Sequence, residues 1–121
     1  MQVFLCTIIQ RKTIMTDRHF SDFHIAGFTY YDGIEVYESL KVGTKVSLKA
    51  EPNNGYDPDA IAIFLNETML GYIPREENTL ISKFFKLGYT NLFEAKVSQI
   101  NPETHPEKQV RVTVRIVQVK K

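Results

Sequence analysis

Residues 109–119 have the sequence QVRVTVRIVQV, the clearest secondary-structure signal in the chain. Apolar side chains stand at every second position: Val110, Val112, Val114 and Ile116. Strict alternation indicates a strand with one buried and one solvated face, because successive side chains of a strand point to opposite faces. Residues 45–51, KVSLKAE, alternate in the same way. Both stretches are therefore predicted to be half-buried strands.

Further strands are predicted between these two stretches and before them. Residues 23–31, FHIAGFTYY, are rich in aromatic and β-branched side chains, and Asp-Gly at 32–33 follows as a turn dipeptide. Residues 60–65, AIAIFL, are almost continuously apolar, as in a central strand. Asn-Glu at 66–67 then leads into residues 69–73, so this pair is predicted to form a hairpin.

One segment has helical spacing. It begins after Pro74 with Glu76 and Glu77, whose charges favour the first turn of a helix, and Gly88 is well placed as a left-handed cap. Its apolar residues recur three and four apart: Leu80, Ile81, Phe84, Phe85 and Leu87. A strand over residues 92–100 follows. The order predicts a mainly β fold, a small closed or nearly closed antiparallel barrel of five to six strands with one main helix between the fourth and fifth.

Length and composition limit what the chain can be. It has 121 residues, 43% hydrophobic and 24% charged, which suits one globular domain. We assign residues 22–121 to that domain and residues 1–21 to a leader or an extra strand. The net charge is +1, so nucleic acid or membrane would have to be bound by a local patch. The single Cys6 excludes an internal disulfide, and residues 1–10 are too short for a signal peptide or a membrane span, so we expect a cytoplasmic protein.

Signatures of catalysis and of bound cofactors are missing from the sequence. It has no glycine-rich phosphate loop, no dinucleotide fingerprint and no GxSxG elbow. The histidines His19, His24 and His105 are too scattered for a metal motif, and His24 has the alternating position of a structural residue. We therefore predict no catalytic residues, no metal and no cofactor.

The loop at residues 51–60, EPNNGYDPDA, is the exception to this lack of functional signatures. Asn-Gly and Asp-Pro are ordinary turn formers, so a simple connection is one interpretation. A calcium loop built on Asn53, Asp57 and Asp59 is another, although their spacing does not fit an EF-hand. Neither explains Tyr56, an aromatic residue in a polar loop, which either plugs a barrel end or presents its ring to a ligand.

Three motifs in order carry a family resemblance: GFTYYDG at 27–33, KVSLKAEPNNGYDPDAIAI at 45–63, and GYIPRE at 71–76 before an amphipathic helix. Together they resemble the HIRAN family over residues 22–119. The resemblance implies an OB-like β-barrel that binds single-stranded DNA, preferentially at a free 3′-hydroxyl end, and serves DNA repair or processing. It also implies a binding module and not an enzyme, and a helicase or nuclease acting in trans as the kind of protein partner.

The resemblance also assigns roles to individual residues. Tyr30, on the predicted first strand, and Tyr56 match positions that stack terminal bases. Asp57 matches the carboxylate that accepts a hydrogen bond from the 3′-hydroxyl. Arg75 matches a basic position that contacts the backbone near the end. Further candidate nucleic-acid contacts are Asn53, Asn54 and Tyr72.

Two departures from the family pattern weaken the expected affinity. Thr29 stands where the DNA-end-binding relatives carry arginine, and Gly55 stands where proline is frequent. A basic C-terminus offers partial compensation, or else forms a solvated barrel face: Lys108, Arg111, Arg115, Lys120 and Lys121. The alternatives to DNA binding are a protein-interaction module on the same barrel and, with least support, a small enzyme using the carboxylates of Asp57 and Asp59.

Overall fold

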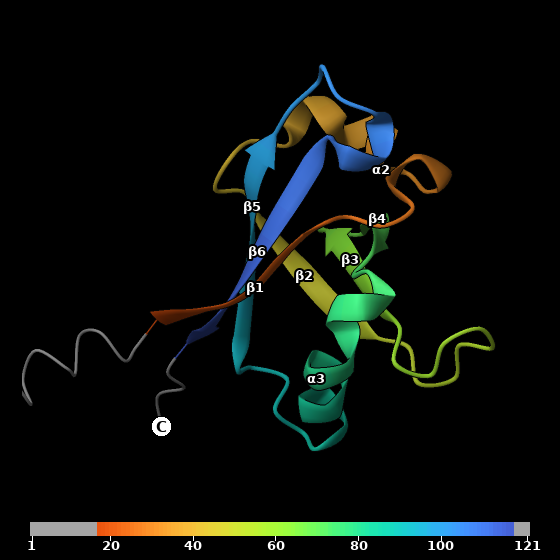
Figure 1. Cartoon of the computed structure of the whole chain (residues 1–121), viewed down its shortest axis with the longest axis vertical. Helices are drawn as coiled ribbons and strands as arrows, with labels where there is room; N and C mark the ends of the chain where they lie inside the picture. Colours follow the sequence, from red (N-terminus) through yellow and green to blue (C-terminus); the bar gives the residue numbers. More distant parts are fainter. Residues whose placement is uncertain (1–16, 118–121) are drawn as a thin grey trace, which may run out of the picture.

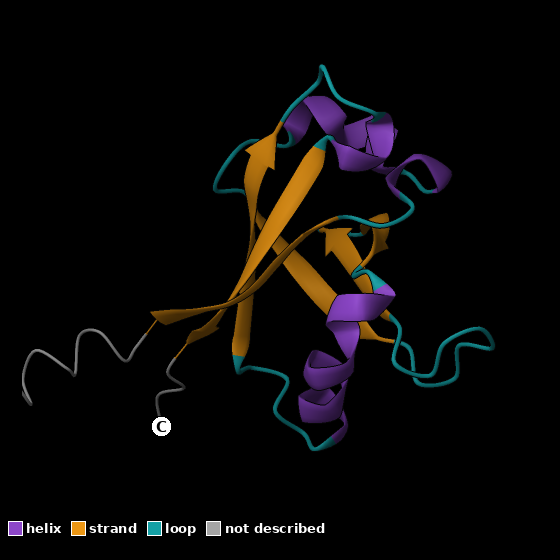
Figure 2. Ribbon diagram, viewed as in Figure 1, coloured by secondary structure: helices purple, strands orange, loops and turns teal. Residues whose placement is uncertain are grey.

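The computed structural model describes residues 17–117. Within this range six antiparallel strands form one sheet in the order β1-β6-β5-β2-β3-β4, curled into a half-barrel (Figure 1). The strands are β1 (Asp17–His24), β2 (Lys45–Ala50), β3 (Ile61–Leu65), β4 (Thr68–Tyr72), β5 (Phe93–Ile100) and β6 (Val110–Val117). The main helix, α3 (Arg75–Lys86), lies between β4 and β5 (Figure 2). The predicted mainly β fold, with its main helix between the fourth and fifth strands, is confirmed.

The two outer strands of the sheet meet at one point. The N–H of Ala26, just after β1, donates to the carbonyl of Tyr72 on β4 at 2.8 Å, and the N–H of Tyr72 donates back to Ala26 at 2.9 Å. Gly71 permits this approach, because a Cβ atom there would lie 2.5 Å from the Ala26 carbonyl oxygen. The half-barrel is therefore closed at this point by a bridge between β4 and the residue that follows β1, beside the predicted site.

The core follows the alternation that the sequence shows. Val110, Val112 and Val114 of β6 are buried, while Arg115 on the opposite face is exposed. On β2 the predicted inward residue Val46 is buried and its neighbours in sequence are exposed. The apolar stretch AIAIFL contains β3, and the predicted turn at 66–67 joins it to β4 as a hairpin.

Helix α3 begins and ends as predicted, and its inward face carries two polar residues. Pro74 precedes its first residue, and Gly88 adopts the left-handed conformation just after Leu87, with φ 96°. The inward face is formed by Asn78, Ile81, Ser82 and the partly buried Phe85, whereas Leu80 and Leu87 are exposed. Two polar residues of the inward face, Asn78 and Ser82, bond to the loop before β3.

The segment after β1 departs most from its prediction. Composition predicts one strand over residues 23–31, but Gly27 adopts a left-handed conformation with φ 74° and ends the extended chain. The short helices η1 (Phe28–Tyr30), α2 (Gly33–Val36) and η2 (Tyr37–Ser39) follow. Tyr30 therefore lies in η1 and not on the first strand.

Some predictions fall on residues that the structure does not describe. They concern the leader up to residue 16, the end of the last predicted strand at residues 118–119, and the basic residues Lys120 and Lys121. No helix within residues 17–117 is long and apolar enough to cross a membrane.

Candidate functional site

An open pocket of about 410 Å³ lies where the 51–60 loop, the end of β4, the start of α3 and the segment after β1 meet. Its lining includes five of the predicted site residues, namely Asn54, Tyr56, Asp57, Tyr72 and Arg75. The remaining lining residues are Ala26, Tyr31, Ala60, Ile73 and Asn78. The bridge between Ala26 and Tyr72 therefore forms part of the pocket wall.

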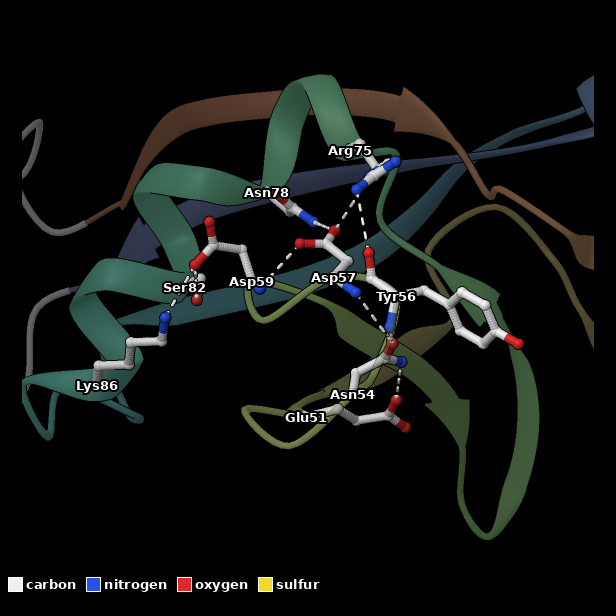
Figure 3. A network of polar contacts seen from close by, with 9 residues as sticks. All are labelled: Glu51, Asn54, Tyr56, Asp57, Asp59, Arg75, Asn78, Ser82 and Lys86. Atoms are coloured by element: carbon white, nitrogen blue, oxygen red, sulfur yellow. Dashed lines mark hydrogen bonds and ion pairs between the residues drawn. The ribbon is translucent and has the colours of Figure 1, made fainter.

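The 51–60 loop is shaped by its own side chains. The amide oxygen of Asn54 accepts hydrogen bonds from the N–H groups of Tyr56 at 2.8 Å and Asp57 at 3.1 Å (Figure 3). This is an Asx turn, in which a side chain replaces a backbone acceptor. The amide nitrogen of Asn54 donates to Oε1 of Glu51 at 3.0 Å. Asn54 thus fixes the positions of Tyr56 and Asp57 in the loop.

The Asp57 carboxylate points from the loop to the first turns of α3 (Figure 3). Oδ1 accepts from the N–H of Asp59 at 2.9 Å, and Oδ2 accepts from Nδ2 of Asn78 at 2.9 Å. Nε of Arg75 lies 3.6 Å from Oδ2. The Asn78 hydrogen bond, then the Asp59 N–H and the Arg75 charge, hold the pKa of the Asp57 carboxyl below its usual value, although partial burial opposes them. Asp57 is therefore ionised at neutral pH and acts as an acceptor.

Asp59 ties the same loop to the later turns of α3. Its Oδ1 accepts from Oγ of Ser82 at 3.1 Å and from Nζ of Lys86 at 2.9 Å (Figure 3). The two aspartates thus contact different turns of the helix. Among residues 17–117 no group of three His, Cys, Asp or Glu side chains is placed to hold a metal ion. The loop is docked on the helix by side chains.

Tyr56 and Arg75 are the most solvent-exposed of the predicted residues that line the pocket. The Tyr56 side chain is 92% exposed, and its ring points away from the carboxylates (Figure 3). Nη2 of Arg75 donates to the backbone carbonyl of Tyr56 at 3.1 Å, while its side chain stays 76% exposed. The Arg75 cation therefore stands next to the Asp57 carboxylate, while the Tyr56 ring is open to solvent on the other side of the loop.

Tyr72 and Tyr31 form the aromatic part of the lining. Their rings meet edge to face, with centroids 5.5 Å apart and planes at 74°. The Tyr72 hydroxyl donates to Oε1 of Glu51 at 2.8 Å. Burial, with this carboxylate, raises the pKa of the Tyr72 hydroxyl well above its usual range, so it remains a donor at physiological pH.

Two predicted site residues lie outside the pocket lining. Tyr30 is 83% exposed in η1, and Asn53 is exposed in the loop. Sequence reasoning missed Tyr31 and Asn78, which do line the pocket. Tyr31 had a signal, since it belongs to the same Tyr-Tyr pair as Tyr30. Asn78 had none, because its role depends on how α3 docks against the loop.

Arg111, one of the basic residues near the C-terminus, has its charge paired inside the sheet. Arg111 pairs with the carboxylate of Asp22 across β1 and β6, and its Nη1 lies 3.5 Å from Nδ1 of His24. Burial and this guanidinium, with Lys108, lower the pKa of His24. The Arg111 charge is thus partly neutralised within the sheet.

Comparison with known proteins places the chain in a family. The HIRAN domain model matches residues 19–119. The chain belongs to the HIRAN family. No curated protein sequence matched it.

Two solved structures resemble the HIRAN chain. One is a protein from Lactobacillus plantarum, with a TM-score of 0.72 and 22% identity over 85% of this chain and 97% of that one. The other is the HIRAN domain of human HLTF, with a TM-score of 0.61 and 20% identity over 84% of this chain and 78% of that one. At these identities the likeness shows a shared fold.

Proposed function

We propose that this HIRAN chain is a non-catalytic module that binds single-stranded DNA, preferentially at a free 3′-hydroxyl end. One observation carries the proposal. Tyr56 with an exposed ring, Asp57 with an ionised carboxylate and Arg75 with an exposed guanidinium all line one open pocket. These groups match the parts of a DNA end, namely a base to stack, a hydroxyl to accept from and a phosphate to neutralise.

The aromatic contribution comes from stacking. Base stacking on an aromatic ring is worth about 1–3 kcal/mol and tolerates any base. Tyr56 offers a solvent-exposed ring for stacking, and Tyr31 and Tyr72 line the same pocket. Tyr30, exposed in η1, is proposed to stack a further base outside the pocket. The site would thus bind a short single strand without strong sequence preference.

End selectivity comes from Asp57. Each oxygen of an ionised carboxylate offers about two acceptor sites. Oδ1 accepts a hydrogen bond from Asp59 and Oδ2 accepts one from Asn78, which leaves acceptor capacity for a hydroxyl. A 3′-phosphate would set an anion against this carboxylate. Arg75 is proposed to contact the nearest backbone phosphate, and Asn53 and Asn54 further backbone or base atoms.

The proposal is tested by fluorescence anisotropy with a 5′-labelled oligo-dT of about ten nucleotides, within the usual site size of such folds, that ends in a 3′-hydroxyl, a 3′-phosphate or a dideoxy sugar. The hydroxyl end should bind about tenfold or more tightly than the other two, since a hydrogen bond to a charged group contributes roughly 1.5–3 kcal/mol. Asp57→Asn should bring the three affinities close together. Glu67→Gln, in the β3–β4 turn away from the pocket, removes the same charge and should preserve the preference.

Equal affinity of the unsubstituted protein for all three ends would refute end recognition. Absence of binding below millimolar concentration would refute DNA binding and favour the protein-interaction module on the same barrel. If the DNA-end activity holds, a helicase or nuclease acting in trans is the proposed class of protein partner, and the module itself needs no cofactor.

A further inference from the structure

A carboxylate from the β5–β6 connection binds the turn that precedes Tyr31 of the pocket wall. Glu107 lies in η3 (Pro106–Lys108), within the β5–β6 connection. Its Oε1 accepts from the N–H of Gly27 at 2.8 Å, and its Oε2 accepts from the N–H of Thr29 at 3.0 Å and from the Thr29 hydroxyl at 2.5 Å. Figure 1 shows this connection, in blue, next to the short helices that follow β1.

The hydrogen bonds to Glu107 are strengthened by the charge of its carboxylate. Partial burial acts to raise the pKa of Glu107, but the hydrogen bonds from Thr29 and Gly27 outweigh it, and the pKa lies below its usual value. Glu107 is therefore ionised at neutral pH. Hydrogen bonds to an ionised acceptor are roughly twice as strong as neutral ones. The contact thus behaves as a clamp between two segments distant in sequence.

The connection that presents Glu107 is itself well ordered by hydrogen bonds. The N–H of Asn101 donates to the carbonyl of Gln109 at 2.8 Å, closing the base of the loop. The Gln109 side chain donates to the carbonyl of Thr104 at 3.0 Å, and Nδ1 of His105 accepts from the N–H of Glu107 at 3.1 Å. These hydrogen bonds order the loop and thereby hold Glu107 in a defined position.

The clamped turn is continuous with the wall of the pocket. A Cβ atom on Gly27 would lie 3.2 Å from Cε2 of Tyr31, so the Tyr31 ring packs against the same residue whose N–H Glu107 binds. Tyr31 in turn meets Tyr72 edge to face. Tyr30 lies between the clamped Thr29 and Tyr31 in sequence. Release of Glu107 would therefore free the turn that positions Tyr31.

We propose that Glu107 is a positioning residue for the site, which fixes the Gly27–Thr29 turn and thereby places Tyr31 in the pocket wall. The inference about DNA affinity rests on the proposed function, whereas the inference about Tyr31 concerns the free protein. Glu107 contacts no ligand in this arrangement; it acts through the turn.

The experiment compares Glu107→Gln with Glu103→Gln in the full chain. Glu103 is an exposed acid of the same loop, so its substitution removes the same charge without touching the clamp. In the free protein, NMR should show the Tyr31 ring protons moving toward unstructured shifts and faster amide exchange at Gly27 and Thr29 in Glu107→Gln alone. Affinity for the 3′-hydroxyl oligo-dT should fall about tenfold, equivalent to about 1.4 kcal/mol.

A double-mutant cycle separates positioning from a general loss of structure. In a Tyr31→Ala background the additional effect of Glu107→Gln on affinity should largely disappear, because the residue that it positions is gone. An unchanged effect in that background would overturn the proposal, and so would tighter binding by Glu107→Gln, which would mean that the carboxylate merely repels DNA. If the unsubstituted protein binds no oligonucleotide, the proposed function fails. The clamp is then judged by NMR alone, where unchanged Tyr31 shifts would refute it.

Discussion

Replacing Gly71 by alanine is predicted to open the sheet where β4 meets the segment after β1. A Cβ atom at position 71 would lie 2.5 Å from the carbonyl oxygen of Ala26 and 2.6 Å from Cγ2 of Ile25. Neither neighbour can swing aside, since one is backbone and Ile25 is 1% exposed. Gly71 also has φ 151°, a conformation that residues with a side chain rarely adopt. The substitution therefore combines a clash with backbone strain.

The magnitude follows from the bonds that the clash would break. The hydrogen bonds between Ala26 and Tyr72, at 2.8 and 2.9 Å, hold this edge. Each such bond contributes about 0.5–1.5 kcal/mol, and the backbone strain costs about 1–3 kcal/mol. We therefore expect Gly71→Ala to lower the free energy of unfolding by about 2–6 kcal/mol, a large part of the roughly 5–15 kcal/mol of a typical domain.

Urea unfolding followed by circular dichroism measures this change, with two glycines as matched controls. Gly43 has φ 97° but no atom within 4 Å of the position that a Cβ would take, so Gly43→Ala isolates backbone strain, about 1–2 kcal/mol. Gly55 has neither a positive φ nor a near neighbour, and Gly55→Ala should change stability by about 1 kcal/mol or less. If Gly71→Ala were no more destabilising than Gly43→Ala, the close approach of Ala26 would not matter and the reasoning would be refuted.

Two further predictions concern the loop and its charges. Tyr56→Ala should weaken oligo-dT binding about tenfold or more by anisotropy, because one stacked base is lost. Tyr89 is exposed and lies outside the pocket lining, so Tyr89→Ala should leave the affinity unchanged. Equal losses of affinity in the two variants would contradict the role of Tyr56 in stacking. Asp57, Asp59 and Glu107 have folded-state pKa values below their ordinary 3.8, 3.8 and 4.5, so the stability they contribute is present above those values and is lost as pH falls through the folded pKa values. Urea unfolding at a series of pH values should therefore show a decline that begins near pH 4.5 and steepens below 3.8; constant stability from pH 6 to about 3 would contradict these pKa directions.

Much of the fold was predictable because local patterns agree with the final packing. The alternation of residues 109–116 can bury one face only in a strand, and Val110, Val112 and Val114 are buried. The Asn-Glu turn joins β3 and β4 because Asn66 tolerates φ 56°. Pro74 and Gly88 mark the ends of α3 through their backbone geometry.

The parts that were missed depend on contacts between distant segments. Residues 28–31 have strand-like composition, yet they turn into η1 after Gly27, where Glu107 binds the N–H groups of the turn. Composition alone does not reveal such a partner. Similarly, α3 buries Asn78 and not Leu80 because Asn78 bonds to Asp57, and helical spacing cannot weigh that bond against apolar burial.

The candidate site was predictable where its residues belong to the sequence motifs, namely the 51–60 loop and the GYIPRE stretch with Tyr72 and Arg75. Asn54, Tyr56 and Asp57 stand close together in sequence, and the structure keeps them at the pocket. The part of the wall formed by Tyr31 and Asn78 is assembled only when the loop docks on α3 and η1 approaches β4. The sequence pointed to Tyr30, while the structure brings its neighbour Tyr31 into the lining.

The bridge between Ala26 and Tyr72 couples the joining of the outer strands to the integrity of the pocket in this small protein. The same two residues join the outer strands and line the pocket. Separation of those strands would therefore also disrupt the part of the pocket wall that Ala26 and Tyr72 form. An occupant that requires the assembled surface must then draw the equilibrium toward the joined state, to a degree set by its free concentration relative to its Kd.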